Sequence, residues 1–118
     1  MAYIRGAVFV ENSAESIAAG AVDLVKKIVE ANALASEQVS AVFFTVTSDL
    51  TATNPATAVR KAFDFANAAY MCATEPNFDG SAQNCVRVCI VAEQLRQTCA
   101  VHVYDGKASS LRPDLAKK

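Results

Sequence analysis

The sequence predicts an α+β domain in which a mixed β-sheet carries one long and one short helix on one face. Apolar residues recur at helical spacing in one long segment, and β-branched runs lie on both sides of it. The expected order is strand, helix, strand, helix and then three short strands, which is typical of a sheet with its helices packed together on one side. We expect residues 1–118 to be a single domain, because 118 residues are too few for two hydrophobic cores.

The N-terminal third is predicted to be a strand over 3–10 and a helix over about 13–31. The strand segment is rich in β-branched and aromatic residues. Asn12 is the expected helix cap, and Glu15, three residues later, is placed to hydrogen-bond back to it. One helical face is apolar through residues spaced by four, three and four: Ile17, Ala21, Leu24 and Ile28.

A second strand and a second helix are predicted next. Residues 39–47 are apolar enough for a central strand. The helix, about 55–66, begins after Asn54 as cap, with Pro55 at the first position, where its missing N–H costs nothing.

The remaining chain predicts short strands over 69–73, 85–91 and 100–104. A turn-rich loop over 75–80 separates the first two. Strand alternation in 85–91 divides the side chains between two faces, with Cys85, Arg87, Cys89 and Val91 on one and Val86, Val88 and Ile90 on the other.

Composition excludes several classes of function. Hydrophobic residues make up 53% of the chain, charged residues 19%, and the net charge is −1, so the protein is not expected to bind nucleic acid. No apolar run reaches the roughly 20 residues of a membrane span, and the N-terminus does not resemble a signal peptide. We therefore expect a cytoplasmic protein without a membrane partner.

The cysteines do not predict a metal site. Cys72, Cys85, Cys89 and Cys99 lack Cys-x-x-Cys spacing, and His102 is the single histidine. We expect reduced thiols that serve mainly as small apolar residues. The sequence also lacks a Gly-rich phosphate-binding loop, since its four glycines are not spaced as one.

Two arginines in the middle of strands are the strongest local signal for a binding site. Arg87 lies between apolar neighbours, and Arg5 lies within the first strand. Either could sit on a solvated face, or both could point into a pocket and bind an anion through their guanidinium forks. With Glu75 and Tyr104 nearby, they would form a site for a small dianion.

Six short motifs, in order from residue 4 to 115, resemble the AroH-class chorismate mutases. They are Arg5-Gly-Ala with Val10-Glu11, Ser48-Asp-Leu with Pro55-Ala-x-Ala-Val-Arg60, Cys72-x-x-Glu75, Cys85-Val-Arg87-Val, His102-Val-Tyr104 and Leu111-Arg-Pro-Asp-Leu115. The resemblance implies a homotrimer that forms a pseudo-α/β barrel, with active sites between subunits. It also implies the Claisen rearrangement of chorismate to prephenate, without cofactor, metal or covalent intermediate.

The resemblance assigns catalytic roles to two residues. Arg87 would hydrogen-bond the ether oxygen, which gains negative charge as its bond stretches, and also a carboxylate. Glu75 would accept a hydrogen bond from the substrate hydroxyl and face the ring, where positive charge develops.

Six further residues would bind substrate by the same resemblance. Arg5 and Tyr104 would hold the side-chain carboxylate, and Cys72 would contact the hydroxyl through its backbone or thiol. Those expected near the mouth are Arg60, Arg112 and Leu111, with Leu111 helping to cover the site. Cys72 could instead be a packing residue, Arg60 an exposed helix residue and Arg112 a solvated charge of the tail.

Three positions depart from the family pattern. Asn54 replaces an aromatic residue, Thr57 a lysine and Met71 a small hydroxyl residue. The alternative function is a non-catalytic, trimeric, small-molecule-binding protein on the same scaffold. Presence of Arg5, Glu75, Arg87 and Tyr104 together argues against it, because a binding protein need not keep a group for the ether oxygen.

Overall fold

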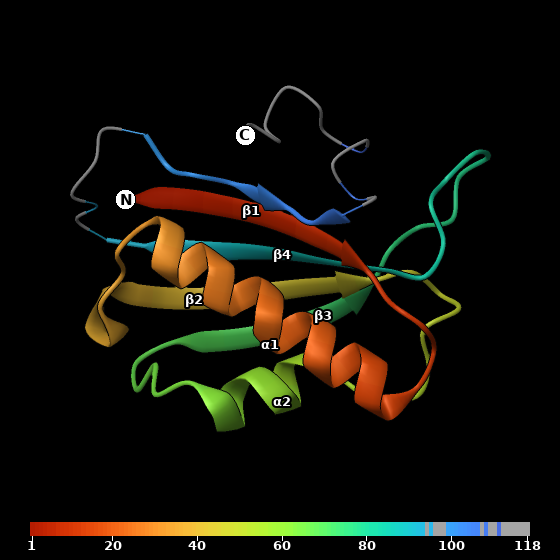
Figure 1. Cartoon of the computed structure of the whole chain (residues 1–118), viewed down its shortest axis with the longest axis horizontal. Helices are drawn as coiled ribbons and strands as arrows, with labels where there is room; N and C mark the ends of the chain where they lie inside the picture. Colours follow the sequence, from red (N-terminus) through yellow and green to blue (C-terminus); the bar gives the residue numbers. More distant parts are fainter. Residues whose placement is uncertain (94, 96–98, 107, 109–110, 112–118) are drawn as a thin grey trace.

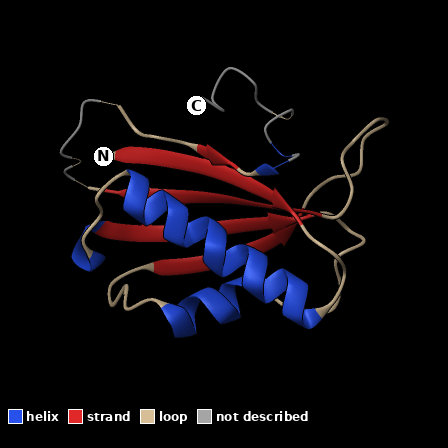
Figure 2. Ribbon diagram, in the orientation of Figure 1, coloured by secondary structure: helices blue, strands red, loops and turns tan. Residues whose placement is uncertain are grey.

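The computed structural model describes residues 1–93, 95, 99–106, 108 and 111 (Figure 1). A five-stranded mixed sheet has the strand order β3-β2-β4-β1-β5. Both helices lie on the same face of this sheet (Figure 2). The elements along the chain are β1 (Ala2–Phe9), α1 (Ala14–Ala31), the short 3-10 helix η1 (Ser36–Gln38), β2 (Val39–Val46), α2 (Pro55–Ala62), β3 (Ala69–Thr74), β4 (Cys85–Ala92) and β5 (Val103–Tyr104). The predicted α+β class and helix placement are confirmed.

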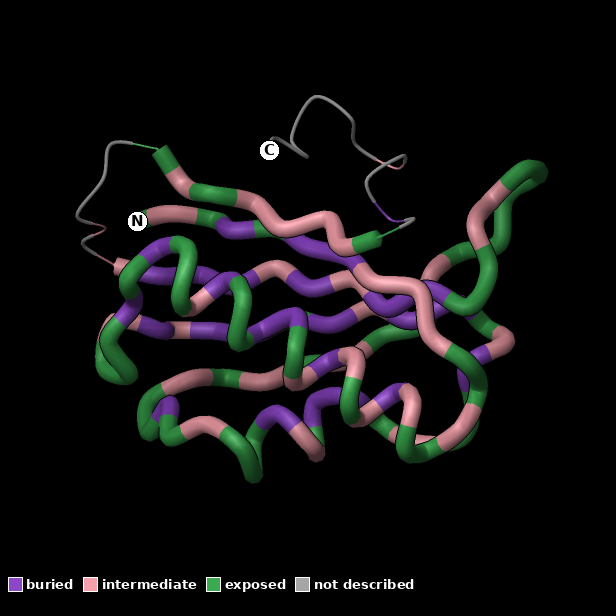
Figure 3. Tube along the Cα trace, viewed as in Figure 1, coloured by how far each residue is buried: buried purple, intermediate pink, exposed green. Residues whose placement is uncertain are grey.

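The central strand β4 runs antiparallel to both of its neighbours, β1 and β2. The outer strands pair in parallel, β3 with β2 and β5 with β1. Because side chains alternate along every strand, the register divides them between a helix-covered face and a helix-free face. Figure 3 shows the resulting alternation of buried and less buried positions along the sheet.

The hydrophobic core lies between the helices and the covered face. Helix α1 buries five apolar side chains, at Ile17, Ala21, Leu24, Val25 and Ile28, as its apolar periodicity predicts. They pack in one cluster with Ile4, Val42, Phe44, Val86, Val88 and Ile90 of the sheet. A side chain at Gly6 would obstruct this packing, because its Cβ would lie 2.7 Å from the Val103 carbonyl oxygen.

The predicted cap of α1 is wrong by one residue. Ser13, not Asn12, is the cap, and its Oγ accepts from the Ser16 N–H at 3.0 Å. Glu15 was expected to hydrogen-bond back to the residues before the helix, but Ser16 does so instead. Its Oγ accepts a hydrogen bond from the Glu11 N–H at 2.9 Å. The Asn12 side chain instead holds the distant loop, where its Oδ1 accepts from the Thr51 N–H at 2.9 Å.

Helix α2 ends at Ala62, four residues earlier than predicted, whereas its cap Asn54 is confirmed by a 2.9 Å hydrogen bond from the Ala56 N–H. From Phe63 the backbone is extended. Phe63 and Phe65 then stack with ring centroids 5.2 Å apart. Positions two apart point in different directions on a helix but to the same side of an extended chain, so this stacking requires the helix to end.

The last strand is shorter than the predicted 100–104. Both backbone groups of Val101 bind the buried side chain of Asn32, at 2.7 Å through the N–H and 2.9 Å through the carbonyl. The Arg5 N–H donates to Nδ1 of His102 at 3.0 Å. These side-chain bonds replace strand pairing, so β5 begins only at Val103.

Candidate functional site

The helix-free face brings three of the predicted site residues into one cavity. Arg87 of β4 pairs with Ala7 of β1, and Ala7 pairs in turn with Tyr104 of β5. Arg5 lies two residues before Ala7, so all three side chains share this face. The cavity, of about 260 Å³, is lined by Arg5, Gly6, Phe43, Thr45, Arg87, Val88, Cys89 and Tyr104.

Glu75, just after the end of β3, does not line this cavity but contacts two residues that do, Arg87 and Thr45. Its N–H donates to the Val46 carbonyl at 2.9 Å, which extends the β2–β3 pairing by one residue. Its Oε2 lies 3.1 Å from Nε of Arg87, and the same oxygen accepts from Oγ1 of Thr45 at 2.6 Å. Three neighbouring strands therefore fix the carboxylate beside the guanidinium.

The Arg87–Glu75 ion pair does not satisfy the whole guanidinium. Nε is close to Oε2, yet its N–H is not directed at that oxygen, so this buried nitrogen has no aligned hydrogen-bond acceptor among the described residues. The side chain of Arg87 is 36% exposed, and that of Glu75 is 21% exposed. Arg87 can therefore accept an anionic ligand from the open side of the cavity.

The charge in the cavity suits a ligand with two negative groups. Arg5 and Arg87 contribute two positive charges, and Glu75 compensates only one. Cys89 is on β4, two residues after Arg87, and it pairs with Arg5 of β1. Burial raises the pKa of the Cys89 thiol, and the charge of Arg5 lowers it.

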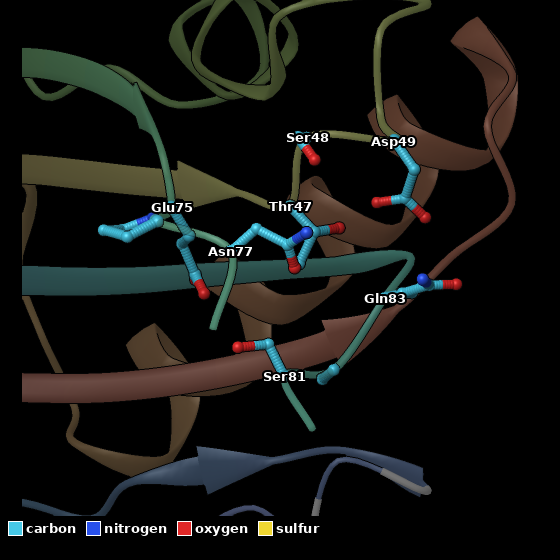
Figure 4. A pocket seen from close by; sticks show the side chains of 9 residues that line it. Thr47, Ser48, Asp49, Glu75, Asn77, Ser81 and Gln83 are labelled. Atoms are coloured by element: carbon cyan, nitrogen blue, oxygen red, sulfur yellow. The ribbon is translucent and has the colours of Figure 1, made fainter. Parts of the chain in front are cut away.

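A small polar pocket of about 40 Å³ is also lined by Glu75 (Figure 4). Its labelled side chains come from the loops after β2 and β3 and the segment before β4. A hydrogen bond from Thr47 and another from the Asn84 N–H, at 2.9 Å, lower the pKa of Asp49. Thr47 also accepts from the Cys85 N–H at 3.0 Å, so this pocket anchors the start of the strand that carries Arg87.

Cys72 lies on the opposite face from Arg87. It pairs with the buried Phe44, and its side chain packs against the core under the helices. Burial raises the pKa of its thiol. Of the two contacts predicted for Cys72, the geometry leaves the backbone as the route to the cavity, since the thiol points away.

Arg60 is also distant from the cavity within one chain. It is exposed on α2, on the helix-covered side, and lines a separate cavity of about 370 Å³ with Tyr70. Burial raises the pKa of Tyr70, whereas the charge of Arg60 lowers it. The structure therefore does not bring Arg60 together with Arg87 within this chain.

The predicted residues of the tail are only partly described. Leu111 and Tyr104 both pack against a small buried cluster of Ala7, Cys85 and Ala108 on the helix-free face. Burial raises the pKa of the Cys85 thiol to about 11, which makes it unreactive. Arg112 lies outside the described residues.

Thr45 is the site residue that sequence reasoning missed. Its contact with Glu75 depends on the pairing of β2 with β4, where Thr45 stands directly opposite Arg87. Alternation within 39–47 places it on one face with Phe43 but does not say which neighbour that face meets. Prediction of this contact would have required the pairing register of β2 with β4.

The described residues contain no group of three His, Cys, Asp or Glu side chains that could hold a metal ion. Neither described α-helix is long and apolar enough to cross a bilayer.

Comparisons with known proteins agree with one another. Residues 1–115 match the family model described as chorismate mutase type I. The protein described as chorismate mutase AroH from Bacillus subtilis (strain 168) is 35% identical over 115 residues, which cover 96% of this chain and 91% of that protein. The protein of the same description from Thermus thermophilus is 38% identical over 115 residues, with coverage of 95% and 93%. A solved structure of chorismate mutase from Clostridium thermocellum has a TM-score of 0.86 and 34% identity, covering 93% of this chain and 99% of its own.

Proposed function

This chain belongs to the chorismate mutase type I family, and we propose that the cavity on its helix-free face is the site of reaction. The protein is a chorismate mutase, an isomerase that converts chorismate to prephenate in aromatic amino acid biosynthesis. The alternative of a non-catalytic binding protein is not favoured by this family membership.

The rearrangement sets what the site must do. One C–O bond of the enolpyruvyl ether breaks while a C–C bond forms, and no proton or electron is exchanged with the protein. No cofactor is therefore required by the chemistry. Catalysis must come from holding the reactive conformer and from stabilising the charge that separates in the transition state.

Arg87 and Glu75 carry the two ends of this charge separation in our proposal. The guanidinium meets the ether oxygen, which becomes negative, and the carboxylate faces the ring, which becomes positive. The observation that supports this most directly is the 3.1 Å approach of Arg87 Nε to Glu75 Oε2 at the edge of a cavity that also contains Arg5 and Tyr104. Arg5 and Tyr104 then bind the side-chain carboxylate, and the Cys72 backbone binds the hydroxyl. Leu111 and Arg112 are the remaining proposed substrate-binding residues.

The activity and its location can be tested together. Purified protein should consume chorismate, followed by the loss of its ultraviolet absorbance, and form prephenate in metal-free buffer. Arg5→Ala should raise KM, because it removes a carboxylate partner. Lys26→Ala, which removes one positive charge from an exposed position on α1, is the matched control and should leave KM unchanged. No chorismate consumption by the wild-type protein would refute the function, and an unchanged KM in Arg5→Ala would refute the location.

We also propose that the single 118-residue domain works as a homotrimer whose sites lie between subunits. The helix-free face leaves large apolar side chains exposed, namely Tyr3 at 58%, Phe43 at 38% and Met71 at 62%. A second subunit would cover them. Arg60, on the other side of its own sheet, would then contribute to the cavity of a neighbouring subunit.

Mixing of inactive subunits tests this arrangement. Arg60→Ala and Arg87→Ala should each be poorly active alone. After unfolding and refolding together in equal amounts, about a quarter of the sites should contain both intact arginines and regain activity. Light scattering should give the mass of three chains, and Met71→Glu should reduce it. A monomeric mass, or no activity in the mixture, would contradict the proposal.

We propose a cytoplasmic location because the cysteines are not paired in disulfides. All four are free thiols, at positions 72, 85, 89 and 99, as is usual in a reducing compartment. Fractionation of cells that produce the protein should recover it with cytoplasmic markers.

A further inference from the structure

The hydroxyl of Thr45 has a position that the assigned roles do not explain. Thr45 of β2 stands opposite Arg87 of β4 in the sheet, and its Oγ1 lies 2.6 Å from Glu75 Oε2. An ionised carboxylate has no proton to give, so the hydroxyl is the donor. The same Oε2 faces Nε of Arg87 at 3.1 Å, so one carboxylate oxygen is held from two sides.

We propose that Thr45 is a positioning residue that keeps Glu75 at the Nε side of Arg87 and so leaves the terminal guanidinium nitrogens for substrate. An unrestrained carboxylate beside an arginine favours a bidentate pair, with both oxygens on two nitrogens. Such a pair would place Glu75 where an anionic ligand must bind. The hydrogen bond from Thr45 opposes it by holding Oε2 over β2.

The contacts of the three residues agree with this role. The terminal nitrogens of Arg87 make no hydrogen bond to any residue that the structure describes, although Glu75 is adjacent. Thr45 itself lines the cavity and is only partly buried, so its hydroxyl is not needed to satisfy the core. Its effect on substrate is exerted through Glu75 and Arg87, and the inference therefore rests on the proposed function.

Kinetics of Thr45→Val test the proposal. Valine keeps the branched shape and suits a strand but cannot donate. Glu75 should then compete with substrate for Arg87, and KM should rise about tenfold, which is at the lower end for a hydrogen bond to a charged group. The value of kcat should stay within about twofold, because bound substrate displaces the competing pair. Thr45→Ser restores the donor and should restore KM.

A matched control and a second background make the test specific. Thr74→Val makes the same change on the neighbouring strand, at a residue on the other sheet face, and should leave KM unchanged. In a Glu75→Gln background the neutral amide cannot form the ion pair, so adding Thr45→Val should change KM by less than about twofold. An unchanged KM in Thr45→Val, or an equal effect in both backgrounds, would overturn the proposal.

A measurement without substrate separates this inference from the proposed function. Side-chain N–H resonances of Arg87 in 15N-labelled protein should shift in Thr45→Val, as the terminal nitrogens acquire a carboxylate, and should keep wild-type positions in Thr45→Ser. If the wild-type protein consumed no chorismate, the proposed function would be refuted. The spectra would still show whether Thr45 keeps Glu75 away from the terminal nitrogens of Arg87. Identical spectra in all three proteins would overturn the proposal. If Thr45→Val does not fold, Thr45→Ala takes its place in both measurements.

Discussion

Replacing Arg87 by lysine separates the charge of this side chain from its shape. Arginine presents several donors in a fixed fork, so one part can face Glu75 while another faces the substrate. A lysine has one compact ammonium group. With Glu75 only 3.1 Å from the present Nε, that ammonium pairs with the carboxylate and no longer reaches the ether oxygen.

The expected cost follows from this geometry. Loss of one preorganised donor to a developing negative charge costs about 3–4 kcal/mol, or roughly 10²–10³ in kcat. Arg87→Lys should lose on the order of 10², and Arg87→Ala at least as much. The stability cost of Arg87→Ala should be only about 1 kcal/mol, because the side chain is 36% exposed and its ion pair is partly solvated.

Turnover of chorismate measured by absorbance, together with urea unfolding, distinguishes these two effects. Both variants should unfold near the wild-type midpoint and differ from it mainly in kcat. Full activity in Arg87→Lys would show that charge alone is sufficient and would refute the fork argument. Loss of folding in parallel with activity would assign the residue a structural role instead.

Three more predictions concern the scaffold. Gly6→Ala should destabilise the protein by about 1–3 kcal/mol and lower kcat/KM, because the new Cβ would meet the Val103 carbonyl at 2.7 Å and displace the strand that carries Tyr104; a wild-type melting temperature would contradict this. Hydrogen bonds lower the pKa of Asp49 from its ordinary 3.8, so its contribution to stability is present above that pH and is lost as pH falls through the folded value. Asp49→Asn should therefore be less stable at neutral pH and less sensitive to acid, as urea midpoints at several pH values would reveal; an unchanged acid dependence would count against it. Cys72→Ser should keep its activity, since the thiol faces the helices, and an inactive but folded variant would disprove that reading.

Local patterns predicted the elements well where one periodicity continued long enough. Helix α1 was predicted within one residue at its start, and alternation in β4 assigned Arg87 to the correct face with Cys85 and Cys89. Both inferences need only residues close in the chain, because the side-chain pattern repeats every 3.6 residues in a helix and every two residues in a strand.

Boundaries set by distant partners could not be predicted in this way. Asn12 and Ser13 are both good caps, and the choice was decided by the loop at Thr51, which binds Asn12. The start of β5 was decided by Asn32, 69 residues away from its partner Val101. Long-range hydrogen bonds of this kind leave no mark in a window of neighbouring residues.

The candidate site was predictable in its residue types but not in its contacts. Two mid-strand arginines suggested an anion site, and the family resemblance connected them with Glu75 and Tyr104. The opposite orientation of the Cys72 thiol and the bridge from Thr45 to Glu75 both depend on the register of β2 with its neighbours. Register is a property of strand pairs, and a single strand sequence does not contain it.

The order of the strands has a consequence for how activity arises during folding. The five groups of the proposed site come one from each strand or its end: Glu75 after β3, Thr45 on β2, Arg87 on β4, Arg5 on β1 and Tyr104 on β5. The paired strands are distant in the sequence, so each pairing must close a long loop, which makes such pairings slow to form. A chain with only four strands docked would be compact and yet incomplete at the cavity. Recovery of turnover after refolding therefore reports the docking of the last strand and, in the proposed trimer, the assembly of the subunits, and not the collapse of the core.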